Sequence, residues 1–410
     1  MTVKERFLSY ICYPSGSSEE SGSVPSTPGQ RLFADALVRE LQALGLSDAV
    51  QDENGVVYAH LPPSCGCETA PCLGFLAHMD TSPEFSGEGV CAREIPDYDG
   101  GKVALAGGRV LDPADYPHLS DLRGKTLLCP AGETLLGADD KAGIAEILTA
   151  LEEILATGLP HGAIAVAFTP DEEIGRGVDH FDLARFGADF AFTVDGGAAG
   201  EIESENFNAA TARLSFRGVS VHPGSACGRM VNAIRMAMEF ASLLPDERPE
   251  NTSGRQGFYH ITDMNGGVGE ASVHCILRDF TEEGLEKRKN VVTEAARLLS
   301  ARYPAGSVSL SIRDSYRNMK PALAGHRHLL DEAEKATRAA GLTPATPPIR
   351  GGTDGALLSL RGLPCPNLGT GGYAFHGPYE HIAVEDMEAV TRVLTALVSL
   401  YASVCKENLT

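Results

Sequence analysis

The sequence predicts an α/β protein with a separate α+β insertion, and three observations support this. Helical and strand patterns alternate through the first half of the chain, as in a sheet covered by helices. Three short apolar runs, 72–80, 163–173 and 189–197, turn polar at their ends, as buried strands do on reaching a sheet edge. Near residue 207 the pattern changes to that of a smaller α+β domain.

The length and composition of the chain indicate the number of domains and the class of protein. A chain of 410 residues is too long for one ordinary core, which favours two or three domains. Hydrophobic residues make up 43% and charged residues 22%, the balance of a soluble globular protein. The ten cysteines are scattered through a large chain without secretory features, so we expect reduced thiols.

The charge and the N-terminal text exclude some classes of partner. A net charge of −21 argues against binding nucleic acid or an anionic membrane, because both need clustered Lys and Arg. The first residues carry charges and lack a long apolar core, so they do not resemble a signal peptide. No apolar run approaches membrane-spanning length, and we expect a cytoplasmic protein.

Elements of the first half follow in order. Apolar residues at helical spacing predict a helix over 30–45, after a Ser-Thr-Pro start signal, and a strand near 55–61. A second helix is predicted over 140–157, which places Asp139 at a helix N-terminus, where an anionic side chain is favoured. Because ligands bind outside the carboxyl ends of strands in open α/β sheets, the three apolar runs suggest one shared site.

The second half contains the insertion and then a return to the first pattern. Strand-like text at 211–221 and helices near 228–243 and 281–302 form the insertion, predicted as residues 207–317. Residues 1–206 and 318–410 then form one discontinuous catalytic domain. Its last elements are a helix near 327–340, a turn-rich segment and an amphipathic helix from 384 to 404.

The strand ends carry the residues that a hydrolytic metal site needs, namely imidazoles, carboxylates and a base. In the His-x-Asp text, His78 can bind a metal while the Asp80 carboxylate accepts a hydrogen bond from its other ring nitrogen. In the acidic pair, one of Glu172 and Glu173 can bind metal while the other faces the water, because neighbours at a strand end point in different directions.

Each of these residues also has an ordinary explanation. His78 alone could be a hydrogen-bonded core histidine. The glutamate pair and Asp195 could be solvated residues after a strand, and Asp139 with Asp140 could cap a helix. Their joint placement at one sheet edge favours a two-metal hydrolytic site.

The motifs resemble a known family. Four of them occur in fixed order: HMDTSP at 78–83, GADDKAG at 137–143, FTPDEEIG at 168–175 and VDGG at 194–197. Further text agrees: ENFNAA at 205–210, VHPG at 221–224, GFYH at 257–260, RGGTDGA at 350–356 and GGYAFHG at 371–377. Over nearly its whole length the sequence is similar to the peptidase T family of tripeptide aminopeptidases, within the two-zinc aminoacylase and carboxypeptidase superfamily.

The resemblance implies a fold and a set of metal ligands. The fold is a catalytic three-layer α/β/α domain with a mixed sheet, plus a smaller inserted α+β lid and dimerisation domain. Asp139 would bridge two metal ions, His78 and Asp195 would complete one of them, and Glu173 and His376 would complete the other.

It also implies the remaining roles. The superfamily pattern selects Asp139 over Asp140, assigns Glu172 as the general base and makes Asp80 the orienting carboxylate. A competing imidazole, His381, lies five positions after His376.

Substrate-binding residues are implied for the insertion and the loop after it. His222 would polarise the scissile carbonyl, across a dimer in similar enzymes, although His-Pro-Gly is also ordinary turn text. Arg350 would clamp a substrate carboxylate, with a structural ion pair as its competitor. Asn232 would help to hold substrate, or be a solvated residue.

The function that follows is removal of the N-terminal residue from tripeptides by water activated at two divalent ions. Zinc is the expected metal, and manganese or cobalt also suits these ligands. The partners expected are short peptides with a free N-terminus and a second copy of the chain, bound through the inserted domain. The alternatives are a related dipeptidase, carboxypeptidase or N-acyl-amino-acid hydrolase, and a metal- or peptide-binding protein without catalysis.

Overall fold

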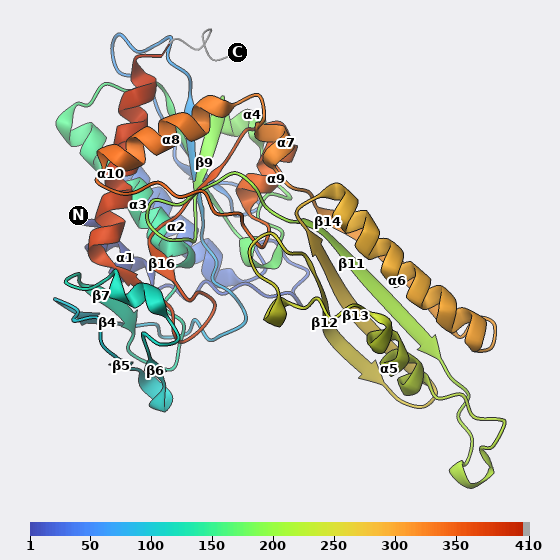
Figure 1. The fold of residues 1–410 in the computed structure, drawn as a ribbon. Coiled ribbons are helices and arrows are strands. Elements are labelled where there is room, and N and C mark those ends of the chain that lie inside the picture. Colours follow the sequence, from blue (N-terminus) through green and yellow to red (C-terminus); the bar gives the residue numbers. More distant parts are fainter. Residues whose placement is uncertain (405–410) are drawn as a thin grey trace. The chain divides into compact units, whose positions relative to one another are not determined.

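The computed structural model describes residues 1–404, which form two compact units (Figure 1). The main unit comprises Met1–Ser204, Pro321–Pro347 and the chain from Thr353 onward. The inserted unit comprises Glu205–Lys320 and the short segment Pro348–Gly352. The inserted unit is thus slightly longer than the predicted 207–317, and it includes a segment that the sequence places in the catalytic domain.

A seven-stranded mixed sheet forms the centre of the main unit. Strands β3, β8, β9 and β15 run parallel, and strands β1, β2 and β10 are antiparallel to their neighbours. In spatial order the strands are β1 (Val50–Gln51), β2 (Val57–Leu61), β8 (Ile164–Thr169), β3 (Leu73–His78), β9 (Phe190–Val194), β15 (Asn367–Leu368) and β10 (Ile202–Glu203).

The three central strands are buried at every residue, which explains their continuous apolar text. The register of the sheet aligns their carboxyl ends. His78, the last residue of β3, lies opposite Thr169, the last residue of β8. On the other side of β3, Leu76 lies opposite Thr193 of β9. Residues that follow these strands therefore emerge together at one edge of the sheet.

Helices cover the sheet of the main unit. Side chains of α4 and α9, among them Phe186 and Leu358, pack with Leu76, Ala165 and Ala191 of the sheet. Helix α3 contacts β3 and β9 and packs against α1 and α10. The helices are α1 (Val3–Tyr10), α2 (Pro28–Ala43), α3 (Ala138–Thr157), α4 (Leu183–Phe186), α7 (Lys320–Leu323, at the boundary of the units), α8 (Arg327–Ala339), α9 (Asp354–Leu360) and α10 (Val384–Ala402).

A second, antiparallel sheet belongs to the main unit. Two of its strands flank the loop that contains His376, so this sheet helps to position that residue. Its order is β16 (Gly372–Tyr373), β17 (His381–Ala383), β7 (Leu127–Pro130) and β4 (Ala92–Ile95), with a separate pair β5 (Val103–Ala104) and β6 (Val110–Leu111).

The inserted unit has its own core. Alternate residues of β11, such as Ala212, Leu214 and Phe216, are buried against its two helices, while the residues between them are more exposed. Its antiparallel sheet has the order β12 (Phe258–Gly266), β13 (Glu270–Asp279), β11 (Asn208–Arg217) and β14 (Val308–Tyr316), and its helices are α5 (Ala233–Leu243) and α6 (Glu282–Arg302).

The predicted fold class is confirmed, because the main unit is an α/β domain with a mixed sheet. Most predicted elements lie within a few residues of their observed bounds. The helix predicted near 228–243 begins later, at Ala233, where the side chain of Asn232 accepts a hydrogen bond from the Arg235 backbone N–H and caps it. Between residues 1 and 404, no helix is both long enough and apolar enough to cross a bilayer.

Gly143 tests the contact between α3 and the sheet. A Cβ atom at this position would lie 1.9 Å from the carbonyl oxygen of Val194 in β9. Gly to Ala inside a helix ordinarily stabilises by about 0.5–1 kcal/mol, but here overpacking should dominate. We expect Gly143→Ala to lower the free energy of unfolding by about 1–3 kcal/mol in urea denaturation. Gly132→Ala, with open space around its Cβ, should change it little.

Candidate active site

The predicted site residues of the main unit meet at the carboxyl edge of its central sheet. His78 ends β3, the glutamate pair follows β8, and Asp195 directly follows β9. Asp139 lies in the first turn of α3, where its φ of −85° and ψ of 106° are not yet helical. His376 comes from the connection between β16 and β17. Five separate segments therefore contribute to one cluster.

Asp139 lies between the two imidazoles. Its Oδ1 is 2.9 Å from Nε2 of His78, and its Oδ2 is 3.3 Å from Nε2 of His376. Burial alone would raise the pKa of Asp139, but its hydrogen bonds with His376 and His78 lower it. An ionised carboxylate with one oxygen toward each imidazole suits a bridging ligand.

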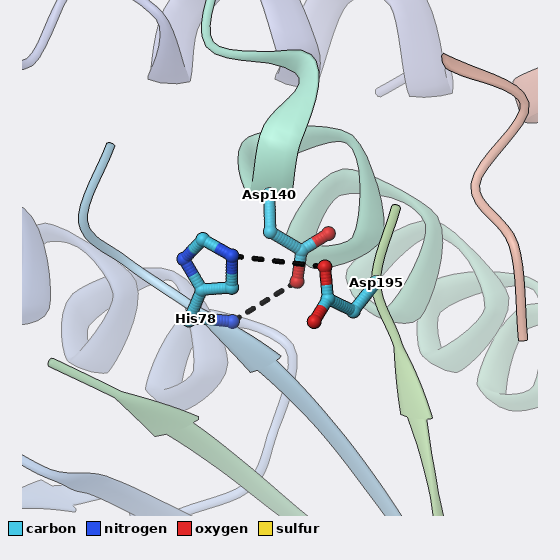
Figure 2. Close-up of side chains that lie close together, drawn as sticks. All are labelled: His78, Asp140 and Asp195. Atoms are coloured by element: carbon cyan, nitrogen blue, oxygen red, sulfur yellow. Dashed lines mark hydrogen bonds and ion pairs between the residues drawn. The ribbon is translucent and has the colours of Figure 1, made fainter. Parts of the chain in front are cut away.

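Glu173 and Asp195 lie on the two sides of this carboxylate. Oε2 of Glu173 is 2.9 Å from Nε2 of His376. Oδ1 of Asp195 is 3.7 Å from Nε2 of His78 (Figure 2). Burial, with Asp139 nearby, raises the pKa of Glu173 to about 7. Its Oε1 is buried and has no hydrogen-bond partner within residues 1–404. Such an oxygen calls for a cation or water.

Asp140 makes different contacts from Asp139. Its Oδ2 accepts a hydrogen bond of 3.0 Å from the backbone N–H of His78 (Figure 2). Asp140 is fully buried, and burial raises its pKa well above the usual value, with Asp195 adding to the effect. His78, Asp140 and Asp195 also lie close enough to share an ion. Asp139 alone of the two aspartates, however, is paired with both imidazoles.

Asp80 does more than orient His78. The ring Nδ1 of His78 lies 3.0 Å from the backbone oxygen of Asp80 and 3.5 Å from its carboxylate, so the closer acceptor is the carbonyl rather than the predicted side chain. The carboxylate instead accepts backbone N–H bonds from Glu172 at 2.9 Å and Glu173 at 3.2 Å. Asp80 therefore ties the end of β3 to the glutamate loop.

The surroundings of Glu172 favour the protonated form of its carboxyl group, so it can retain a proton that it has accepted. Burial raises its pKa well above the usual value. His78 opposes this rise, and Asp195 and Asp354 add to it. Asp354, in the Gly-Thr-Asp-Gly text, is a buried carboxylate that sequence reasoning did not single out. General bases work best when their pKa lies near the working pH, and burial moves the pKa of Glu172 in that direction.

Glu380 was also missed. Its buried carboxylate accepts three backbone N–H bonds, from Leu136 at 2.7 Å, Gly137 at 2.8 Å and Asp139 at 3.0 Å. It thereby joins the segment that carries His376 to the loop that carries Asp139. The signal in the sequence was an acidic residue four positions after a candidate ligand, which is too common to identify it.

His381 lies apart from the cluster that contains His376. Its Nδ1 is 2.7 Å from the backbone oxygen of Tyr379, and its Nε2 is 2.9 Å from Nε2 of His118. Burial lowers the pKa of His381 to about 4. His376, by contrast, faces both Asp139 and Glu173. The geometry favours His376 as the ligand.

The three predicted substrate residues belong to the inserted unit. His222 is exposed, and its Nδ1 accepts the backbone N–H of Gly224 at 3.2 Å. Asn232 caps α5. The guanidinium of Arg350 stacks on two phenylalanines and donates to four oxygens of the 252–256 loop rather than to a structural carboxylate. A substrate carboxylate would compete with these acceptors.

The donor set suits divalent metal ions. Two imidazoles and several carboxylates lie with their ligand atoms a few ångströms apart, and the buried Oε1 of Glu173 lacks a protein partner in the described chain. Imidazole with carboxylate oxygen is a ligand combination used by zinc and by other first-row metals. The residues present therefore fit a metal centre.

Comparison with known proteins places this chain. The model of peptidase family M20/M25/M40 matches residues 137–400, more than half of the sequence. The chain belongs to this peptidase family. Within it, proteins called peptidase T from Caldanaerobacter subterraneus subsp. tengcongensis and Vibrio parahaemolyticus are each 47% identical to it, covering 97% of this chain and 98% of their own length.

Solved structures agree on the fold of this M20/M25/M40 peptidase. Aminopeptidase PepT from Bacillus cereus aligns with a TM-score of 0.75 at 23% identity, and a tripeptidase from Staphylococcus aureus with 0.78 at 21%. Each alignment covers 98% of both chains. A Bacillus subtilis protein described as a dinuclear metal-binding peptidase of the M20 family aligns at 0.62, with 15% identity, over 97% of both chains. The predicted family resemblance is confirmed.

The bonds made by Glu380 lead to a prediction for this M20-family site. In Glu380→Gln one acceptor oxygen becomes an NH2 group that faces backbone N–H groups, so the Asp139 loop should lose its fixed position. We expect metal affinity to fall about 10–100-fold, the usual range for groups that support metal ligands, in a competition assay with a fluorescent chelator. Glu388→Gln, an exposed residue of α10, is the matched control. Unchanged affinity would contradict the role given to Glu380.

Proposed function

We propose that this chain is a two-metal aminopeptidase that removes the N-terminal residue from tripeptides. The observation that carries the proposal is the Asp139 carboxylate between two imidazoles, with Glu172 beside the Glu173 ligand. The substrate class rests on relatives called peptidase T at 47% identity over almost the full length.

In the proposed site the ligands divide into two sets. His78 and Asp195 would hold one ion, His376 and Glu173 would hold the other, and Asp139 would contribute to both. When bound, two divalent cations would polarise the peptide carbonyl and lower the pKa of the attacking water. Zinc is the metal we propose, and the same ligands also suit manganese or cobalt.

Glu172 is the proposed general base. It takes a proton from the attacking water and passes it to the leaving amine as the peptide bond breaks. Burial favours the protonated carboxyl between these steps, because it raises the pKa of Glu172. Asp80 holds the backbone of Glu172 and so fixes where its side chain starts.

The remaining roles complete the proposal. His222 donates a hydrogen bond to the developing oxyanion, and Asn232 and Arg350 bind the substrate. We further propose a cytoplasmic location and a homodimer that forms through the inserted unit.

A panel of peptides tests the substrate class. After chelation and restoration of zinc, manganese or cobalt, we expect release of the first residue from tripeptides, with weaker turnover of di- and tetrapeptides, followed by mass spectrometry. Chelated enzyme should be inactive. The N-acetyl form of the same tripeptide should not be cleaved. Equal cleavage of the N-acetyl form would instead indicate an acyl-amino-acid hydrolase, and release of the last residue a carboxypeptidase.

Substitution of the base tests the mechanism. Glu172→Gln keeps the shape of the side chain but cannot accept the proton, so kcat should fall about 100- to 10,000-fold. Metal content, measured by mass spectrometry of digested protein, should stay at the wild-type value. The exposed Glu88→Gln serves as control. Near-normal turnover by Glu172→Gln would remove Glu172 from its role.

A further inference from the structure

Asp171, the residue before the proposed base, is bound to the N-terminal part of the chain. Its Oδ2 accepts the backbone N–H of Ser26 at 2.7 Å. Its Oδ1 accepts the hydroxyl of Ser26 at 2.5 Å and the side-chain amide of Gln30 at 2.7 Å. The Asp171 carboxylate is thus used by residues far away in sequence and not by its own loop.

The bond between Asp171 and Gln30 is reciprocal. The backbone N–H of Asp171 donates to Oε1 of Gln30 at 3.0 Å, while the amide nitrogen of Gln30 donates to the Asp171 carboxylate. Gln30 is 0% exposed and Asp171 is 1% exposed, so water cannot replace these bonds. A two-point contact of this kind fixes both the position and the orientation of the Asp171 backbone.

The backbone at Asp171 needs such support. Its φ of 59° lies in the left-handed region, which costs a residue other than glycine about 1 kcal/mol or more and persists where surrounding structure holds it. Glu172 is the next residue, so the direction of its side chain depends on the dihedral angles of Asp171. A relaxed Asp171 would move Glu172.

The same N-terminal part of the chain also holds the end of β3. The backbone N–H of Ser17 donates to the carbonyl of Thr81 at 3.1 Å, and the N–H of Thr81 donates to the carbonyl of Ser15 at 3.3 Å. The hydroxyl of Ser15 donates to the carbonyl of Met79 at 2.7 Å. These contacts flank Asp80, the residue that binds the backbone of Glu172 from the other side.

We infer that Gln30 and Ser26 are positioning residues for catalysis, acting through Asp171 to hold Glu172 in reach of the attacking water. The inference rests on the proposed role of Glu172. The Ser26 hydroxyl and the Gln30 amide donate to Asp171, which is not one of the proposed metal ligands. Their loss should therefore reduce the rate of the chemical step and leave metal binding intact. Misplacement of a catalytic group by about 1 Å can cost about 100-fold.

Gln30→Met tests this assignment, because it keeps the length of the side chain and removes both bonds to Asp171. We expect kcat to fall at least about tenfold, with KM and metal content within twofold of wild type. The matched control is Gln42→Met in the same helix, since Gln42 is exposed and its side chain donates to the carbonyl of Ala49. Wild-type kcat in Gln30→Met, or a loss proportional to lost metal, would overturn the inference.

A second measurement separates positioning from a general structural defect. In a Glu172→Gln background there is no base to misplace, so adding Gln30→Met should not lower the residual rate further. An equal fold-loss in both backgrounds would overturn the inference. If Gln30→Met does not fold, Ser26→Ala takes its place in the same cycle, with thermal unfolding as the check. It removes the hydroxyl that donates to Asp171 and accepts from Ser18 and Gln30, and it keeps the backbone bond from Ser26 to Asp171.

Failure of the proposed function would look different. If the wild-type enzyme cleaves an acylated amino acid or a dipeptide and not a tripeptide, the substrate proposal is wrong. The cycle is then run on the substrate that is cleaved, because the loop serves any reaction in which Glu172 moves the proton. If Glu172→Gln itself retains full activity, the proposed base is wrong and the inference falls with it.

Discussion

Repulsion among buried carboxylates is the constraint around which this site is organised. Several acidic side chains, most of them largely shielded from water, lie within a few ångströms of the imidazoles of His78 and His376. The structure divides them into two groups. Asp139, Asp195 and Glu173 face the histidines and are available to cations. The other carboxylates accept hydrogen bonds from backbone N–H groups, which stabilise the negative charge without a counter-ion.

The second group builds the scaffold for the first. Asp80 and Asp140 bind the amides of the glutamate loop and of His78, and Glu380 binds the loop before α3. Asp171 uses N-terminal residues in the same way. At this sheet edge, some of the chain's acidic residues therefore serve to hold neighbouring segments in place. The segments of His78, Asp139 and the glutamate pair are each held by a carboxylate that belongs to another segment.

Much of the fold could be predicted from sequence, because its signals are local. Continuous apolar runs revealed the buried parallel strands, and their polar ends located His78, Glu173 and Asp195 at one edge. Glu380 and Gln30 could not be found in this way, since their partners lie far away in the chain and an isolated acid or amide carries no pattern. The grouping of 348–352 with the inserted unit likewise has no local signal in the sequence, because it depends on contacts with residues that lie far away in the chain.

The order of the ligand segments has a consequence for synthesis. Asp195 precedes the inserted unit, whereas His376 and Glu380 follow it. A ribosome therefore makes the first part of the donor set, then a whole separate unit, and only then the residues that complete the cluster around Asp139. A growing chain cannot assemble the full centre while those residues are missing. The complete site, and with it the peptidase activity, therefore forms late in translation, after the parts of the chain made earlier have had time to fold.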